Sequence, residues 1–373
     1  MSSTGKSCVY FNFHGITTLA VEGNDPIVDY LCFQYREFLQ SGSDFKADLS
    51  LKIVDKARPD KHANYYSEDR FRFYIDNDNF YWSLYGKSVF FKGTDTLASV
   101  KTIYCETGFN RIQLNMILEL FLRIRFIKSG IALLHAACFS DKNNNAILVP
   151  AAKSTGKTAL CLNALKAGFE FLSDDRVWLD RQGRIFAFPR YIVITQSNAK
   201  HFRAFQGKKN AYRTRFRNII ISITPGTLLK KIMNKVLRRI APFHAVHYKI
   251  QEIYPTVKST MQANLYGTAL LVKDKKSDGN LHPIKTDALE GFISQVANLE
   301  WNYTLLNAAS IHDMLFMDGP KWHTELQELI TEDRSITKEA LQGKSNHVIG
   351  IYGSAENIDW NTITTQLKKL IIN

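Results

Sequence analysis

The chain has 373 residues, enough for two or three domains of ordinary size. Hydrophobic residues make up 45% and charged residues 22%, a composition typical of folded globular proteins that excludes wholesale disorder. The N-terminus lacks the apolar core of a secretory signal, and no apolar run approaches the roughly 20 residues of a membrane-spanning helix.

The cysteines are odd in number, widely spread and without a Cys-x-x-Cys pair. They are Cys8, Cys32, Cys105, Cys138 and Cys161. This pattern argues against a disulfide framework or a zinc site and favours a reducing compartment. We therefore expect a cytoplasmic protein.

Residues 1–106 contain short, aromatic-rich runs separated by turn residues. These runs are Val9–Phe13, Asp48–Ile53, Phe71–Ile75, Asn79–Tyr85 and Ser88–Lys92. The pattern predicts a mostly antiparallel β-rich α+β region. The helical spacing of Ile27–Leu39 predicts one inserted helix within it.

Residues 107–373 are predicted to form a second, α/β domain. Apolar residues at helical spacing predict a helix over Arg111–Lys128, ended by Gly130. The expected series that follows is a buried strand Ile131–Phe139, a strand Ala146–Val149, a loop Pro150–Gly156, a helix Lys157–Ala167 and a strand Phe169–Leu172. Further elements are expected at Leu265–Lys273 (strand), Asp287–Trp301 (helix), His347–Tyr352 (strand) and Trp360–Ile372 (helix). Strand, loop, helix and strand in this order build a phosphate-binding α/β core.

The loop matches three positions of the phosphate-binding pattern Gly-x-x-x-x-Gly-Lys-[Ser/Thr]. It reads Ala151-Ala152-Lys153-Ser154-Thr155-Gly156-Lys157-Thr158, with alanine in place of the first glycine. Gly156 lets the backbone turn its N–H groups toward one phosphate, and the N-terminus of the next helix favours an anion. Lys157 can reach the β- and γ-phosphates, and Thr158 can hold Mg²⁺. The pattern therefore predicts an ATP-binding loop; the alternative is a chance Gly-Lys-Thr before an ordinary helix.

An acidic pair, Asp174-Asp175, ends the strand that follows this helix. Beside a phosphate loop, one carboxylate can hold the metal while the other accepts a proton from an attacking hydroxyl. The alternative is a solvated Ser-Asp-Asp turn. His135 lies in an otherwise apolar strand, either as a satisfied core residue or near Asp174, tuning its protonation.

From His135 to Arg190, about 55 residues, the sequence resembles the HPr kinase/phosphorylase-like family of bacterial serine kinases. The matching pieces are Leu134-His135-Ala136-Ala137, Ala146–Val149, Gly156-Lys157-Thr158, Leu165-Lys166-Ala167-Gly168, Leu172-Ser173-Asp174-Asp175 and Phe188-Pro189-Arg190. The family loop usually has glycine where this chain has Ala151 and Ser154. The closer likeness is to divergent members found beside peptide-modification genes.

The resemblance implies a P-loop nucleotide-binding core of the HPr kinase/PEP carboxykinase-like type. It implies ATP and Mg²⁺ as cofactors, Asp174 as the base with His135 as its partner, and Asp175 with Thr158 at the metal. The implied reaction transfers the γ-phosphoryl group to a serine-type hydroxyl of a peptide or protein. A small-molecule kinase and a catalytically impaired nucleotide-binding scaffold remain the alternatives.

The net charge of +13 comes from one segment. Sixteen basic residues and no acidic residue lie between Arg181 and Gln251, within which 191–251 is predicted to be an insertion. Within it, Gly226–Ile240 is predicted to form a basic amphipathic helix. This helix can pack on the core, bind an acidic acceptor, or bind anionic lipid or nucleic acid, and we rank nucleic acid last. The candidate substrate-binding residues are Arg190, Arg213 and Arg215. The sequence leaves open whether the chain forms a homo-oligomer.

Overall fold

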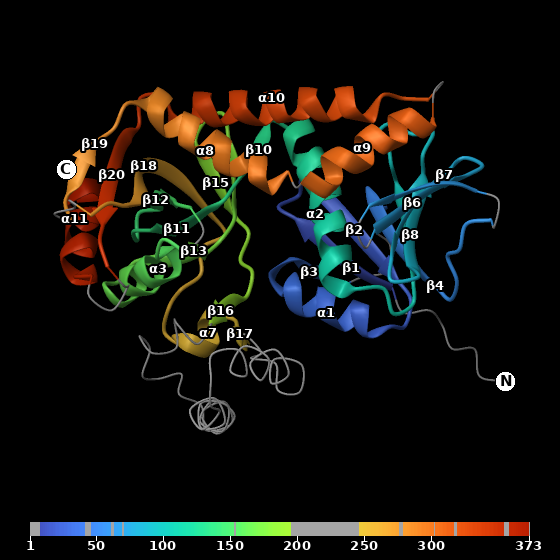
Figure 1. Cartoon of the computed structure of the whole chain (residues 1–373). Coiled ribbons are helices and arrows are strands. Elements are labelled where there is room, and N and C mark those ends of the chain that lie inside the picture. Colours follow the sequence, from blue (N-terminus) through green and yellow to red (C-terminus); the bar gives the residue numbers. More distant parts are fainter. Residues whose placement is uncertain are drawn as a thin grey trace, which may run out of the picture.

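The structure, a computed structural model, describes residues 8–41, 46–60, 63–68, 71–152, 154–194, 246–275, 279–301, 303–316, 319–353 and 358–372. Within them the fold is mixed α/β, with two nine-stranded mixed sheets and a small two-stranded sheet. Figure 1 shows the two large sheets side by side, with helix α2 between them and helix α10 across one end of both.

The first sheet contains the aromatic-rich N-terminal strands in the order β3-β1-β2-β4-β9-β8-β7-β6-β5. Their bounds are β1 Cys8–Phe13, β2 Thr17–Glu22, β3 Leu39–Gln40, β4 Leu49–Val54, β5 Asn64–Glu68, β6 Phe71–Asp76, β7 Asn79–Leu84, β8 Lys87–Lys92 and β9 Thr102–Glu106. Most neighbours are antiparallel, as predicted, but β4 runs parallel to both β2 and β9. Parallel pairs need long crossovers, and here α1 and the β5–β8 meander supply them.

The inserted helix is shorter than predicted. Helix α1 spans Pro26–Gln34, with Asp25 as its N-cap accepting a hydrogen bond from the Ile27 N–H at 2.8 Å. A short 3₁₀ turn at Arg36–Phe38 follows, and Leu39 then pairs with Phe11 in the sheet. The helix therefore ends where the chain must return to extended geometry to add an edge strand.

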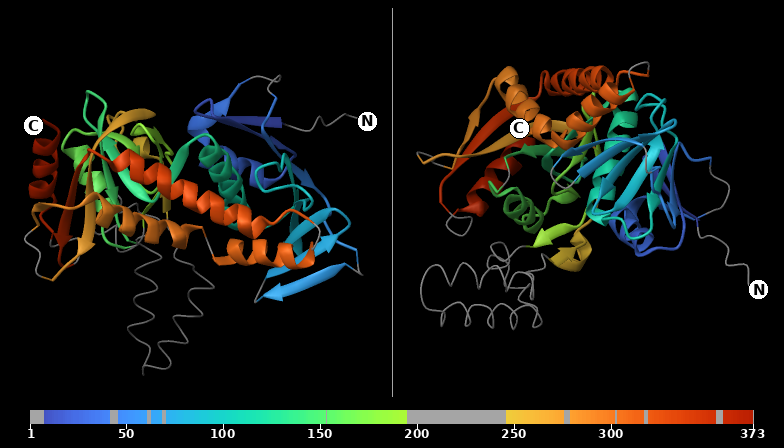
Figure 2. Two further views of the ribbon diagram at one scale, coloured as in Figure 1. Left: turned by 90° about the horizontal axis from the view of Figure 1, so that it is seen from above. Right: turned by 45° about the vertical axis from the view of Figure 1, so that its right-hand side comes forward.

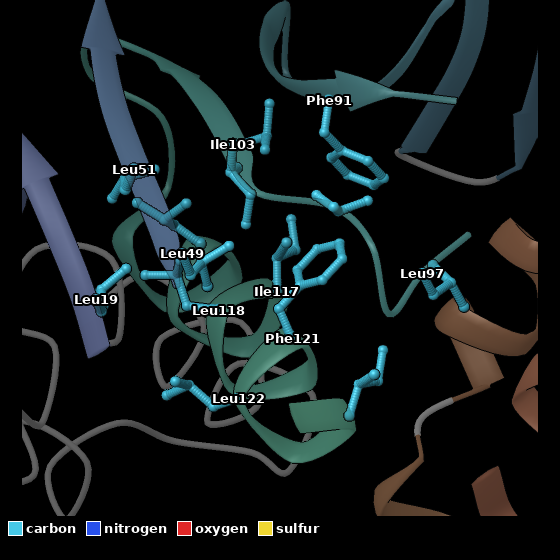
Figure 3. Packing of buried hydrophobic residues seen from close by; sticks show 14 of the residues in the cluster. Leu19, Leu49, Leu51, Phe91, Leu97, Ile103, Ile117, Leu118, Phe121 and Leu122 are labelled. Atoms are coloured by element: carbon cyan, nitrogen blue, oxygen red, sulfur yellow. The ribbon is translucent and has the colours of Figure 1, made fainter. Parts of the chain in front are cut away.

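Helix α2, Arg111–Lys128, has the predicted bounds. The Asn110 side chain caps its N-terminus by accepting from the Ile112 and Gln113 N–H groups. Its apolar face packs on the first sheet, where Ile117, Leu118, Phe121 and Leu122 meet side chains of β2, β4, β8 and β9, as Figure 3 shows. Each such fully buried aliphatic or aromatic side chain contributes roughly 1.5–3 kcal/mol.

The second sheet follows the order β10-β14-β15-β18-β12-β11-β13, with β20 beside β18 and β19 beside β20. Its strands are β10 Ile131–Leu134, β11 Ala136–Ser140, β12 Asn145–Pro150, β13 Glu170–Ser173, β14 Val177–Asp180, β15 Arg184–Ala187, β18 Gln262–Lys273, β19 Leu281–Pro283 and β20 Ser345–Ile351. The predicted single strand Ile131–Phe139 is wrong. It is two strands interrupted at His135, because β10 pairs with β14 whereas β11 pairs with β12 and β13.

The C-terminal helices are α8 Thr286–Glu300, α9 Tyr303–Leu315, α10 Trp322–Leu341 and α11 Trp360–Ile372. The predicted helices at α8 and α11 are present, whereas α9 and α10 were not predicted. Figure 2 shows α10 running along both sheets. Trp322 at one end packs against Phe80 and Phe91 of the first sheet, and Asp333 pairs with Arg123 of α2.

Only the ends of the basic insertion are described. Strands β16 Ile192–Ile194 and β17 Val246–Tyr248 pair with each other, and the short helix α7, Ile250–Ile253, follows. The predicted helix Gly226–Ile240 lies outside the described residues. Among the helices that the structure describes, none combines the length and the apolar character needed to cross a lipid bilayer.

Candidate functional site

The predicted phosphate loop connects strand β12 to helix α3, Lys157–Lys166. Ala151 forms a parallel bridge to Leu271 of β18 at the end of the strand. Gly156 is the N-cap of α3 and has φ +116°, a left-handed conformation that glycine adopts without a Cβ penalty. The expected order of strand, loop and helix is thus present, with the first N–H groups of α3 following Gly156 directly.

The two positions where glycine was expected differ in the backbone they require. Ala151 is not among the described residues with positive φ, so its methyl group causes no backbone strain. Ser154 has φ +63°, the left-handed region that costs a non-glycine residue about 1 kcal/mol. Lys153, predicted to belong to the same loop, lies outside the described residues.

Helix α11 packs on this loop, a contact that the sequence did not predict. A Cβ built on Gly156 would lie 3.1 Å from the Trp360 ring. Trp360 is buried in the same apolar cluster as Leu160 of α3 and Ile351 of β20. Thr155 is held within the loop, because its Oγ1 donates to the Ala152 carbonyl at 2.7 Å.

Asp174 lies against the start of α3. The Thr158 hydroxyl donates to Asp174 Oδ2 at 3.0 Å, which joins the loop helix to the acidic pair. The Asp174 Oδ1 atom is buried and has no hydrogen-bond partner among the residues described. Burial, together with the neighbouring charge of Asp175, raises the pKa of Asp174 to about 6, although Thr158, Lys157 and His135 act in the opposite direction.

Asp175 has different surroundings, formed by three basic side chains. Its carboxylate oxygens lie 3.4 Å from His135 Nδ1, 3.7 Å from Arg190 Nη1 and 3.9 Å from Arg176 Nε. The Asp175 side chain is 43% exposed, whereas those of His135 and Arg190 are each 17% exposed. His135, expected beside Asp174, pairs with Asp175 and also acts to lower the pKa of Asp174.

A buried carboxylate on α2, Glu119, completes the cluster and was missed by the sequence analysis. It pairs with both Arg176 and Arg190, the latter at 3.3 Å. On its other side it accepts a hydrogen bond from Asn115 Nδ2 at 2.7 Å, and Asn115 accepts one from Tyr35 at 2.8 Å. An acidic residue within the apolar face of a predicted helix was the available signal, because a buried charge needs a partner.

The oxygen donors fit a magnesium–nucleotide complex better than a metal site made by protein alone. Within the described part of the chain, no group of three or more His, Cys, Asp or Glu residues could hold a metal. Mg²⁺ at phosphate-transfer sites is typically held by one or two carboxylates together with substrate phosphates. The Asp175 carboxylate, which is 43% exposed, and the Thr158 hydroxyl are suitable donors for that arrangement.

The remaining substrate-binding candidates divide between described and undescribed parts of the chain. Arg190 lies in the cluster around Asp175, whereas Arg213 and Arg215 lie outside the described residues. No protein-family model matches this chain, and no curated protein is significantly similar to it.

Proposed function

We propose that this protein is an ATP-dependent phosphotransferase that transfers the γ-phosphoryl group to a hydroxyl, with a serine of a peptide or protein as the acceptor. The observation that carries this proposal is the hydrogen bond between Thr158 and Asp174. It brings the N-terminus of the helix after the loop together with an acidic pair, the two parts that phosphoryl transfer requires.

In this proposal the loop and Lys157 bind the nucleotide. The N–H groups at the start of α3 and the helix dipole favour the phosphates. Lys157 is only 8% exposed at the base of the loop, where its charge already acts on Asp174. Thr158 and Asp175 would hold Mg²⁺, which when bound would supply positive charge to neutralise the charge that develops on the transferred phosphoryl group.

Asp174 is the proposed general base. A pKa of about 6 lets the carboxylate be ionised at neutral pH and still accept a proton from the acceptor hydroxyl. Asp175 is oriented by His135, Arg176 and Arg190, so the two neighbouring aspartates have separate roles. Positive charge on Arg176 and Arg190 can in addition position an anionic group of the substrate.

Two alternatives keep the same nucleotide site. A small-molecule kinase would differ only in its acceptor, and a nucleotide-binding scaffold would lack transfer. The left-handed backbone of Ser154 is compatible with both alternatives, because strained residues cluster at ligand-binding loops.

The test uses binding and turnover together. We expect the wild type to bind ATP in the presence of Mg²⁺, Asp174→Asn to keep this binding and Lys157→Ala to lose it. ATP hydrolysis or γ-phosphate transfer should be lost in both variants. Lys166→Ala is the matched control, because Lys166 is an exposed lysine in the last turn of the same helix. Equal ATP binding by Lys157→Ala and Lys166→Ala would overturn the nucleotide site. Binding without hydrolysis or transfer by the wild type would establish the scaffold instead.

A further inference from the structure

The buried carboxylate of Glu119 binds two arginines that also face Asp175. Arg176 Nη1 donates a hydrogen bond to Glu119 Oε2, and Arg190 Nη2 lies 3.3 Å from Glu119 Oε1. The contacts of the same arginines with Asp175 are longer, 3.9 Å from Arg176 Nε and 3.7 Å from Arg190 Nη1. These two distances exceed the length of a hydrogen bond. The arginines are therefore held mainly by Glu119.

Burial favours the pairs with Glu119 over those with Asp175. The side chain of Glu119 is 6% exposed, whereas that of Asp175 is 43% exposed. Opposite charges attract more strongly away from water, and solvent screens the attraction within an exposed pair. The Asp175 carboxylate therefore remains accessible to a metal ion.

Glu119 is itself fixed by a hydrogen-bond series that begins after helix α1. Its Oε1 atom accepts from Asn115 Nδ2 at 2.7 Å, and Asn115 Oδ1 accepts from the Tyr35 hydroxyl at 2.8 Å. Tyr35 is fully buried and Asn115 is 2% exposed. Oε1 is thus shared by Asn115 and Arg190, and Oε2 binds Arg176. A carboxylate bound at both oxygens holds the two guanidinium groups in fixed positions.

The charge of Glu119 also balances the charges around Asp175. Two guanidinium groups, those of Arg176 and Arg190, face the carboxylates of Glu119 and Asp175. Without the charge of Glu119, both positive charges would act on the single Asp175 carboxylate. They would then compete with a divalent cation for this carboxylate and repel it.

We propose that Glu119 is a positioning residue for the metal: by binding Arg176 and Arg190, it keeps the Asp175 carboxylate available to Mg²⁺. This inference rests on the proposed function, in which Asp175 and Thr158 hold Mg²⁺ together with ATP. Glu119 acts only through the two arginines. Loss of its charge therefore weakens the binding of Mg²⁺ and leaves the binding of ATP itself intact.

The test measures ATP affinity over a series of Mg²⁺ concentrations and in EDTA, by isothermal titration calorimetry. We expect Glu119→Gln to need about five-fold more Mg²⁺ than the wild type to reach half of the Mg²⁺-dependent gain in ATP affinity. In EDTA its affinity for ATP should equal or exceed that of the wild type, because the site has gained a positive charge. A purely structural role of Glu119 would instead lower ATP affinity both with Mg²⁺ and in EDTA.

Two further variants change the same charge balance in other ways. Arg176→Gln removes a positive charge and should need less Mg²⁺ than the wild type. The double variant Glu119→Gln/Arg176→Gln restores the sum of charges and should return the Mg²⁺ requirement toward that of the wild type. Circular dichroism of each variant shows whether it folds, and Arg176→Gln carries the test if Glu119→Gln does not. A higher Mg²⁺ requirement in Arg176→Gln than in the wild type would contradict the charge balance.

Glu106→Gln is the matched control, because Glu106 is also a buried glutamate with a basic partner, Lys87 at 2.9 Å, but lies on β9 of the first sheet. Its Mg²⁺ requirement should equal that of the wild type. An unchanged Mg²⁺ requirement in Glu119→Gln, or a higher one in the double variant than in Glu119→Gln, would overturn the role of Glu119 and leave the nucleotide site standing. Absence of Mg²⁺-dependent ATP binding by the wild type would overturn the nucleotide site, and with it this role.

Discussion

Replacing Asp174 with asparagine should stabilise the folded protein at neutral pH while abolishing transfer. The carboxyl of Asp174 has a pKa near 3.8 when exposed to water and about 6 in the fold. Because the unfolded chain releases this proton at lower pH than the folded one, ionisation of Asp174 costs stability as the pH rises from about 4 to above 6. Asparagine retains an oxygen that can accept the Thr158 hydrogen bond and carries no charge.

The size of the effect follows from the pKa difference. Each pKa unit is worth about 1.4 kcal/mol, so the full penalty is about 3 kcal/mol at neutral pH. The advantage of Asp174→Asn over the wild type should therefore grow by about 2 kcal/mol between pH 4 and pH 8. Urea unfolding at both pH values, in the absence of nucleotide and divalent cations, measures this change.

Asp175→Asn is the control for the aspartate experiment. It removes a carboxylate that lies within 4 Å of His135, Arg176 and Arg190, so these basic side chains lose a partner. Because Asp175 also raises the pKa of Asp174, the loss of stability between pH 4 and pH 8 should become smaller in this variant but persist, since burial is the larger cause. A constant difference between Asp174→Asn and the wild type across the pH range, or a difference that favours the wild type increasingly at high pH, would refute the assignment of a raised pKa to Asp174.

Three further predictions concern the loop, the reaction and the helix that joins the sheets. Ser154→Gly should leave the free energy of unfolding unchanged or raise it by up to about 1 kcal/mol, because glycine adopts the left-handed backbone without strain. Ala151→Gly should lower the free energy of unfolding by about 0.4–1 kcal/mol, because glycine gives the unfolded chain more conformational freedom. Urea unfolding measures both changes. The rate of transfer at saturating substrate should rise with pH through a midpoint near pH 6 as Asp174 loses its proton, and a flat profile between pH 5 and pH 8 would exclude Asp174 as the base. Asp333→Leu should destabilise the protein by about 3–5 kcal/mol, because it leaves Arg123 buried without its carboxylate. The double variant Asp333→Leu/Arg123→Met should recover much of that loss. Equal stability of the single and double variants would contradict the buried pairing of Asp333 with Arg123.

Local sequence patterns were sufficient where one element determines its own geometry. The bounds of α2 follow from apolar residues at helical spacing between the capping Asn110 and Gly130. The loop at Gly156 and the strand before Asp174 were found in the same way. The structure in addition explains why Ala151 can replace glycine, since its φ is not positive.

Contacts between distant segments could not be predicted in this way. The strand is interrupted at His135 because β10 and β11 have different partner strands. The apolar run Ile131–Phe139 contains no local signal for this difference. Helix α10 has a regular pattern of buried residues that could have been recognised, but its pairing of Asp333 with Arg123 spans 210 positions. Glu119 reaches the acidic pair only because α2 lies between the two sheets (Figure 1).

The position of Glu119 gives the N-terminal sheet a role at the proposed catalytic site. Tyr35, which follows α1, binds Asn115, which binds Glu119, which in turn pairs with Arg176 and Arg190 beside Asp175. Each of these side chains is polar or charged and pairs with the next one in the series. Helix α2, which contains Asn115 and Glu119, packs on the first sheet through its apolar face. The orientation of Asp175 therefore depends on a sheet whose strands do not contain it, whereas Asp174 is oriented by Thr158 of α3, beside the second sheet. Two adjacent aspartates thus obtain different environments from different parts of the chain, which is the condition for one to act as a base while the other binds a metal.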